Sequence, residues 1–79
     1  MVNLLSRITI DSKVMVGKPT IRGLRITVEQ LLKSLASGVS TQSLLEDFPE
    51  LEKEDILAVL QYAADIVSEE QVFEVSHSK

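Results

Sequence analysis

Three basic side chains, Lys18, Arg22 and Arg25, lie close together in a segment with unusual backbone requirements. Ammonium and guanidinium groups bind phosphate and carboxylate oxygens, and arginine does so through two parallel hydrogen bonds. These residues therefore predict that the segment binds an anion, and the phosphate backbone of a nucleic acid is the ligand that we consider first. The alternative is structural, because Arg22 and Arg25 are equally suited to salt bridges with Asp11, Glu29 or an acid of a partner subunit.

Two glycines and one proline determine the shape of this segment. Gly17 and Gly23 accept positive φ angles, while Pro19 fixes its own φ and favours extended geometry at Lys18. These three residues supply loop geometry and no chemistry. We expect a shaped, extended loop that presents the basic side chains.

Charge is divided unevenly along the chain. Residues 1–33 carry six basic and two acidic side chains, a net charge of +4, whereas residues 34–79 carry two basic and ten acidic ones, a net charge of −8. Because binding follows the local potential more than the mean, the basic half is a candidate contact surface. The alternative is that the two halves neutralise each other, within one chain or across a dimer.

The length of 79 residues predicts one small domain, which buries too little surface to be more than marginally stable alone. The chain contains no cysteine, so disulfides and thiolate metal sites are excluded, and oligomerisation is the expected source of additional stability. It has no apolar run of membrane-spanning length and no secretory signal pattern. A soluble cytoplasmic protein is the expectation.

The hydrophobic pattern predicts a mainly α fold with a short N-terminal β arm at residues 5–27. Residues 7–11 alternate polar and apolar side chains, as a half-buried strand does, and the β-branched character of residues 25–28 predicts a second strand. So small a sheet leaves exposed edges, which a second copy would cover. We therefore expect a two-fold dimer through the arm.

Three helices are predicted after the arm. Thr27 is a good N-cap for the first, and Gly38 lies where an αL residue ends a helix. A second helix begins at Ser40 and is stopped by Pro49, and the third starts near Glu52. The apolar residues predicted for the inner side of the third helix are Ile56, Leu57, Val59, Leu60, Ala63, Ala64 and Val67. Three helices with a short turn between the last two match the outline of a helix-turn-helix domain.

This single domain spans residues 1–70, and a tail spans residues 71–79. The tail contains Val72, Phe73 and Val75 after an acidic helix end. Such a segment can add a strand to a partner protein or lie in its groove, and a basic partner would suit the acidic surroundings. The alternative is that Phe73 folds back onto its own helices or that the tail is disordered.

The residue types needed for catalysis are not brought together by the sequence. The one histidine, His77, lies in a polar tail, and no nucleophile–base arrangement, phosphate-binding P-loop or dinucleotide fingerprint occurs. Glu46, Asp47 and Glu50 form an acidic cluster, which is read as a solvated face because a hard-cation site needs several converging oxygens. We expect a protein that is not an enzyme and uses no cofactor or metal.

Several motifs occur in a characteristic order and spacing. They are Ile8-Thr9-Ile10-Asp11, Gly17-Lys18-Pro19-Thr20-Ile21-Arg22-Gly23, Arg25-Ile26-Thr27-Val28, Leu35-Ala36-Ser37-Gly38, Asp47-Phe48-Pro49-Glu50-Leu51, Glu54-Asp55-Ile56 and Tyr62-Ala63-Ala64. With these motifs the chain resembles the domain-of-unknown-function 433 family over most of its length. The resemblance implies a homeodomain-like helix-turn-helix fold. It also implies an antitoxin of a VapBC-like pair, which binds a PIN-domain ribonuclease and, together with it, operator DNA.

The resemblance and the charges of the third helix point in different directions. A helix-turn-helix protein places the first residues of its recognition helix against base edges. Here those residues include Glu52, Glu54 and Asp55, whose carboxylates the phosphates would repel. Glu52 also stands where the family pattern has a threonine that caps this helix. This replacement weakens the N-terminal cap by about 0.5–2 kcal/mol if no other side chain supplies the capping hydrogen bond.

Two functions are therefore expected as alternatives. The first is an antitoxin-like regulator that neutralises a PIN-type ribonuclease toxin and contacts DNA through Lys18, Arg22 and Arg25. The second is a dimeric protein-interaction module that binds no DNA.

Overall fold

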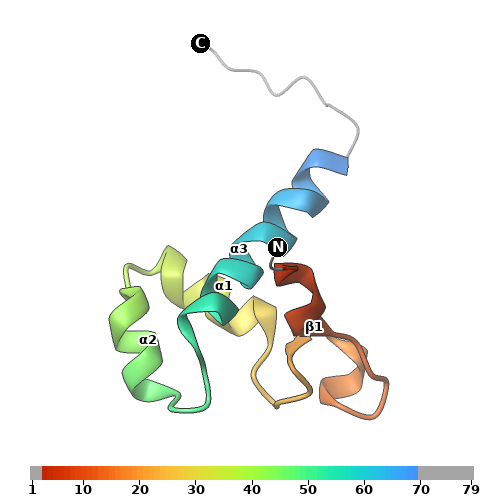
Figure 1. Cartoon of the computed structure of the whole chain (residues 1–79), viewed down its shortest axis with the longest axis horizontal. Coiled ribbons are helices and arrows are strands. Elements are labelled where there is room, and N and C mark those ends of the chain that lie inside the picture. Colours follow the sequence, from red (N-terminus) through yellow and green to blue (C-terminus); the bar gives the residue numbers. More distant parts are fainter. Residues whose placement is uncertain (1–2, 70–79) are drawn as a thin grey trace.

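A computed structural model describes residues 3–69 of the chain and places three α-helices after a short antiparallel strand pair (Figure 1). The elements in chain order are η1 (Leu4–Arg7), β1 (Ile8–Thr9), η2 (Met15–Gly17), β2 (Thr20–Ile21), α1 (Val28–Ala36), α2 (Thr41–Asp47) and α3 (Lys53–Glu69), where η denotes a 3-10 turn. The predicted mainly helical class is confirmed. Within residues 3–69 no helix is long and apolar enough to cross a lipid bilayer.

The second strand is not where the sequence pattern placed it. β1 and β2 pair antiparallel, with Ile8 opposite Ile21 and Thr9 opposite Thr20. The prediction of a strand at residues 25–28 is therefore wrong. Each strand has only two residues, so the sheet is smaller than the pattern suggested.

A tight turn after β2 explains this difference. Arg22 and Gly23 both have positive φ angles, 47° and 76°, and they reverse the chain. The returning segment contributes one isolated bridge, between Thr27 and Thr20, before α1 begins at Val28. Periodicity alone does not reveal a reversal that depends on two left-handed residues.

The predicted ends of α1 are confirmed. Thr27 Oγ1 accepts a hydrogen bond from the N–H of Gln30 at 3.0 Å. At the other end Gly38 has a φ of 96° and donates its N–H to the carbonyl of Leu35, while the next N–H donates to the carbonyl of Ser34. This pair of bonds is a Schellman motif, which ends a helix on a left-handed residue.

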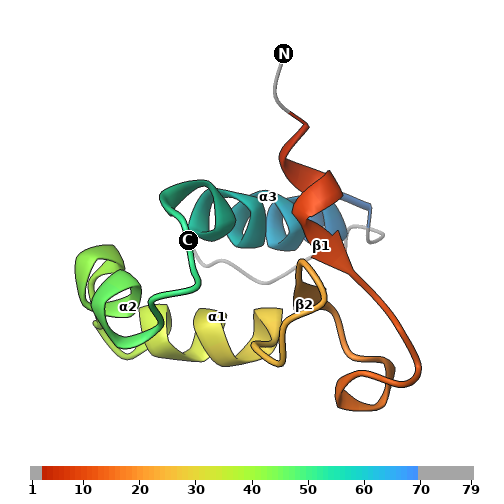
Figure 2. The same ribbon diagram turned by 60° about the horizontal axis from the view of Figure 1, so that its bottom comes forward.

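The core lies where α3 contacts the other elements. α3 contacts α1, α2, η1 and β1, and in Figure 2 it lies over α1, with α2 at one end and the strands at the other. The fully or nearly fully buried apolar residues of this core are Ile21, Ile26, Val28, Leu31, Leu44, Leu51, Ile56 and Val59. Each of β2, α1, α2 and α3 contributes, so the small sheet and the helices share one core.

The outer face of α3 differs from the prediction. Leu57, Leu60 and Val67 were assigned to the inner side, but their exposed fractions are 45%, 47% and 68%. Ala64 is exposed too. Apolar residues extend around most of the circumference of α3, and one layer of neighbours covers only part of it. The sequence pattern could not show which part.

The left-handed end of α1 makes Gly38 sensitive to substitution. We expect Gly38→Ala to lower the free energy of unfolding by about 1–2 kcal/mol, because an L-residue is strained at positive φ. No atom lies within 4 Å of the added Cβ position, so the loss would come from the backbone alone. Urea denaturation measures it. D-alanine at the same position, introduced by chemical synthesis, should not show this loss; an equal loss would contradict the backbone explanation.

Candidate functional site

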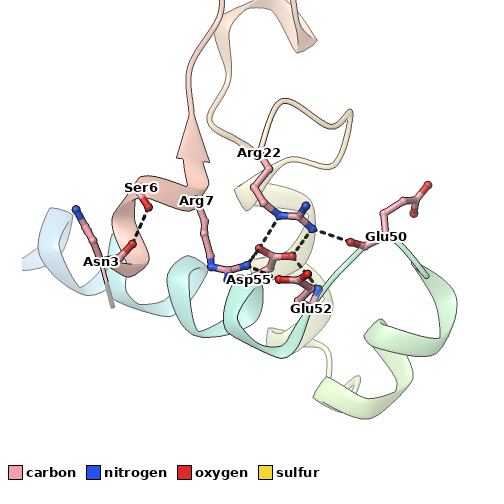
Figure 3. Close-up of polar contacts among 7 residues, drawn as sticks. All are labelled: Asn3, Ser6, Arg7, Arg22, Glu50, Glu52 and Asp55. Atoms are coloured by element: carbon pink, nitrogen blue, oxygen red, sulfur yellow. Dashed lines mark hydrogen bonds and ion pairs between the residues drawn. The ribbon is translucent and has the colours of Figure 1, made fainter. Parts of the chain in front are cut away.

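A buried carboxylate at the start of α3 organises the polar residues near the arm. The side chain of Asp55 is fully buried. Arg22 binds it with two hydrogen bonds, from Nε to Oδ1 at 3.1 Å and from Nη2 to Oδ2 at 2.8 Å (Figure 3). Nη2 of Arg22 also donates to the carbonyl of Glu50 at 2.7 Å. Arg22 therefore joins the loop after β2, the turn before α3 and the first turn of α3.

A second arginine and a backbone amide complete the environment of Asp55. Nη1 of Arg7 donates to Asp55 Oδ1 at 2.9 Å and to Glu52 Oε1 at 2.7 Å. The N–H of Glu52 donates to Asp55 Oδ2 at 2.8 Å. This last bond is half of a capping box, with the acid at the third helical position reaching back to the N-cap. The sequence predicted a weakened N-terminal cap for this helix, because Glu52 stands where a threonine was expected. The bond to the Asp55 side chain supplies a capping interaction at this end. Together Arg7, Arg22, Glu52 and Asp55 form the Asp55 cluster.

The Asp55 cluster holds its central carboxyl in the ionised form. Burial disfavours the charged state of Asp55, but the hydrogen bonds from Arg22, from the Glu52 N–H and from Arg7 together outweigh it, so the pKa of Asp55 is lowered. No buried side-chain polar atom of the described residues lacks a hydrogen-bond partner. The structure therefore favours the structural alternative for Arg22, with an acid that sequence analysis had not considered for it.

The other two predicted basic residues lie outside this cluster. Lys18 Nζ pairs with Glu29 Oε1 at 3.1 Å, one of the acids proposed as a salt-bridge partner, and Glu29 also pairs with Lys33. Lys33 and Lys18 together lower the pKa of the Glu29 carboxyl. Arg25 forms no ion pair with any residue in the part of the chain that the structure describes.

Lys18 and Arg25 line a basic hollow that contains no residue of the Asp55 cluster. It has a volume of ≈ 520 Å³, and it is lined by Ser12, Lys13, Met15, Val16, Lys18, Arg25 and Thr27. Lys13 was not among the predicted contact residues. Like Arg25, it has no ion pair within residues 3–69. The hollow can therefore bind an anion through two unpaired cations and one exposed, paired lysine.

An unusual backbone conformation lies beside the basic hollow. Met15, Val16 and Gly17 all have positive φ angles, 50°, 58° and 79°. A β-branched residue is rare in this region, and such strained residues cluster at functional sites. The turn leaves the Val16 side chain 91% exposed. Gly17 thus supplies loop geometry, as predicted, but it does so as part of a left-handed turn of three residues.

A second surface is apolar and includes Pro19, the residue that follows Lys18 of the basic hollow. This groove has a volume of ≈ 370 Å³ between the start of α1 and the second half of α3. Its lining residues are Pro19, Val28, Glu29, Leu32, Lys33, Tyr62, Ala63, Ile66 and Val67. Pro19, which was expected to shape the basic loop, therefore also forms part of an apolar surface.

The predicted partner-binding residues Val72, Phe73 and Val75 lie outside the described residues. Within the described part, sequence analysis missed the roles of Arg7 and Asp55. A signal for Asp55 was present, because it shares the inner face of α3 with Ile56 and Val59. A carboxylate on a buried face requires partners, and the two arginines of the arm supply them.

Removing the charge of Asp55 tests the cluster. We expect Asp55→Asn to lower the free energy of unfolding by about 3 kcal/mol, since it leaves two arginines without their shared carboxylate. The matched control is Asp47→Asn, an exposed acid of α2, which should change little. Because the pKa of Asp55 is lowered on folding, its contribution is fully present above the unfolded pKa of about 3.9 and is lost progressively as the pH falls from there through the lower folded pKa. Urea denaturation between pH 3 and pH 6 should therefore show a smaller acid destabilisation in Asp55→Asn than in the wild type; equal slopes would contradict this role.

Comparison with known proteins places these features in a family. The model of the family described as “Protein of unknown function (DUF433)” matches residues 8–63. No curated protein and no solved structure matches the chain. The matched residues run from β1 into α3 and include the left-handed turn, the basic hollow and the Asp55 cluster except for Arg7. The chain therefore belongs to the DUF433 family.

Proposed function

We propose that this protein is an antitoxin-like regulator that contacts DNA through the basic hollow and binds a PIN-type ribonuclease toxin. The observation that carries the proposal is the hollow itself. Lys13 and Arg25 have no ion pair within residues 3–69, and a strained left-handed turn holds the loop beside them. Phosphate oxygens are the ligands that such a surface suits.

The proposed DNA contact differs from that of a standard helix-turn-helix protein. The first turn of α3 would face the bases in that arrangement. In this chain Glu52 and Asp55 are engaged by Arg7 and Arg22, so this turn is neutralised and tied to the arm. We therefore assign the DNA contact to Lys13, Lys18 and Arg25 and give Arg22 a structural role.

We assign the toxin contact to the apolar residues of this protein. An apolar groove lies between α1 and α3, and Val72, Phe73 and Val75 follow α3 in the sequence. The proposed regulator is a homodimer, which sequence analysis placed on residues 5–27. Strands of two residues offer little backbone for pairing there.

The alternative is a protein-interaction module that binds no DNA. It is favoured by two observations. Arg22 is committed to Asp55, and Lys18 is paired with Glu29, so two of the three cations predicted to contact DNA have partners within the chain. The residues 34–79 are also strongly acidic, which opposes approach to DNA from that side.

DNA binding tests the first proposal directly. The probe is a fluorescent duplex of the sequence immediately upstream of this protein's own gene, and its anisotropy is followed from 50 to 200 mM salt. A dimer with six phosphate contacts should show a slope of about −5 in log K against log salt. Arg25→Ala removes one contact per subunit and should reduce the slope by about 2.

Lys33→Ala is the matched control for this measurement. It removes an equal charge outside the basic hollow, from an exposed lysine of α1. An equal effect of the two substitutions would show that the hollow is not the contact surface. Absence of binding at 50 mM salt would favour the interaction module.

Partner capture tests the toxin contact. Tagged protein is used at low salt in a lysate of its own cells, and bound proteins are identified by mass spectrometry. We expect a small basic nuclease in near-equal amount, reduced at least about tenfold by Phe73→Ala, because buried aromatic residues dominate such contacts. Recovery of the chain alone would contradict the antitoxin proposal.

A further inference from the structure

The exposed apolar residues of α3 form a regular stripe. Leu57, Leu60, Ala64 and Val67 are separated by three, four and three residues, which is the spacing of the core positions in a coiled coil. All four are exposed, and the three larger side chains have exposed fractions between 45% and 68%. In Figure 1 the second half of α3, which carries Ala64 and Val67, extends beyond the other helices. We call these four residues the α3 stripe.

An exposed stripe of this kind calls for a covering partner. α3 has 17 residues and is therefore about 25 Å long. A strip about 10 Å wide along it covers about 250 Å², whereas a standard interface buries about 800 Å² on each partner. The apolar groove shares Val67 with the stripe and widens the apolar surface. The stripe itself therefore suits a small, weak contact between two chains, at the low end of the range of interface sizes.

We infer that the α3 stripe is the contact surface between two copies of this chain. The two α3 helices pair antiparallel, and their two-fold axis crosses α3 at the level of residue 62. In that arrangement Leu57 faces the partner's Val67, and Leu60 faces the partner's Ala64. Each layer then combines a larger with a smaller side chain, which helps two helices to interdigitate. The spacing of the stripe is symmetric about its centre, as a two-fold contact requires.

Charge selects the antiparallel orientation and a second copy as the occupant. Lys53 continues the stripe by one step, four residues before Leu57. Parallel pairing would bring two copies of Lys53 together. Antiparallel pairing instead brings Lys53 to the C-terminal end of the partner helix, which carries partial negative charge. The last turn of α3 contains Glu69 and no basic residue, so this end complements Lys53.

The inference takes up the homodimer of the proposed function and moves its contact from residues 5–27 to α3. It does not depend on DNA binding. A dimer that binds no DNA would contradict the proposed function and leave the inference intact, and a monomer that binds DNA would do the reverse.

Sedimentation velocity of the full chain from 1 to 300 μM is the first test. We expect a concentration-dependent dimer, and Leu60→Glu should raise its dissociation constant at least about tenfold because it buries an unpaired charge. The matched control is Ile10→Glu, which places the same charge on a side chain that is 63% exposed and belongs to the arm. Circular dichroism verifies that both variants keep their helices.

Two outcomes would overturn the inference. One is a monomer throughout the concentration range. The other is a dimer that Ile10→Glu disrupts and Leu60→Glu does not, which would return the contact to the arm.

Engineered cysteines test the orientation, because the chain has none of its own. Leu57→Cys and Val67→Cys chains are oxidised separately and as an equimolar mixture. Antiparallel pairing predicts disulfide-linked dimers mainly in the mixture, since identical positions would be about 15 Å apart along the helices. Efficient cross-linking of each variant with itself would show parallel pairing and contradict the proposed arrangement. Absence of cross-linking in the mixture as well as in the separate chains would show that the stripe is not the contact.

Discussion

The fold depends on one buried carboxylate and the two arginines that neutralise it. Asp55 is fully buried, and its burial is tolerated because Arg7 and Arg22 bind both of its oxygens. The same contacts join three separate parts of the chain: the end of η1, the turn after β2 and the first turn of α3. The left-handed conformation of Arg22 is held in place by this interaction.

This constraint changes how the helix-turn-helix outline should be understood. The sequence pattern matches the outline, but in the structure the first turn of α3, which the outline would place against DNA bases, is joined to the arm by Arg7 and Arg22. Lys13 and Arg25, two of the basic residues without an ion pair in the described part, lie in a separate hollow formed by the arm loop. The DNA contact that we propose is therefore assigned to this loop, which contains the left-handed turn at residues 15–17.

The helices were largely predictable because their signals are local. Thr27 and Gly38 mark the ends of α1 through side-chain and backbone geometry that depends on few neighbours. The second strand was misplaced because β2 is defined by its pairing with β1 and by a reversal at Arg22 and Gly23. Strand pairing is a contact between distant residues, and periodicity within one segment does not contain it.

The sequence by itself determined the family, the helical class and the loop that carries the basic residues. Only the tertiary structure decided which charges remain available. Arg22 and Arg25 are alike in the sequence, yet one is bound to a buried acid and the other has no ion pair within residues 3–69. Likewise, α3 has apolar residues around most of its circumference, and only packing showed that Leu57, Leu60 and Val67 face outward. The physical reason is that pairing and burial depend on which distant surfaces meet.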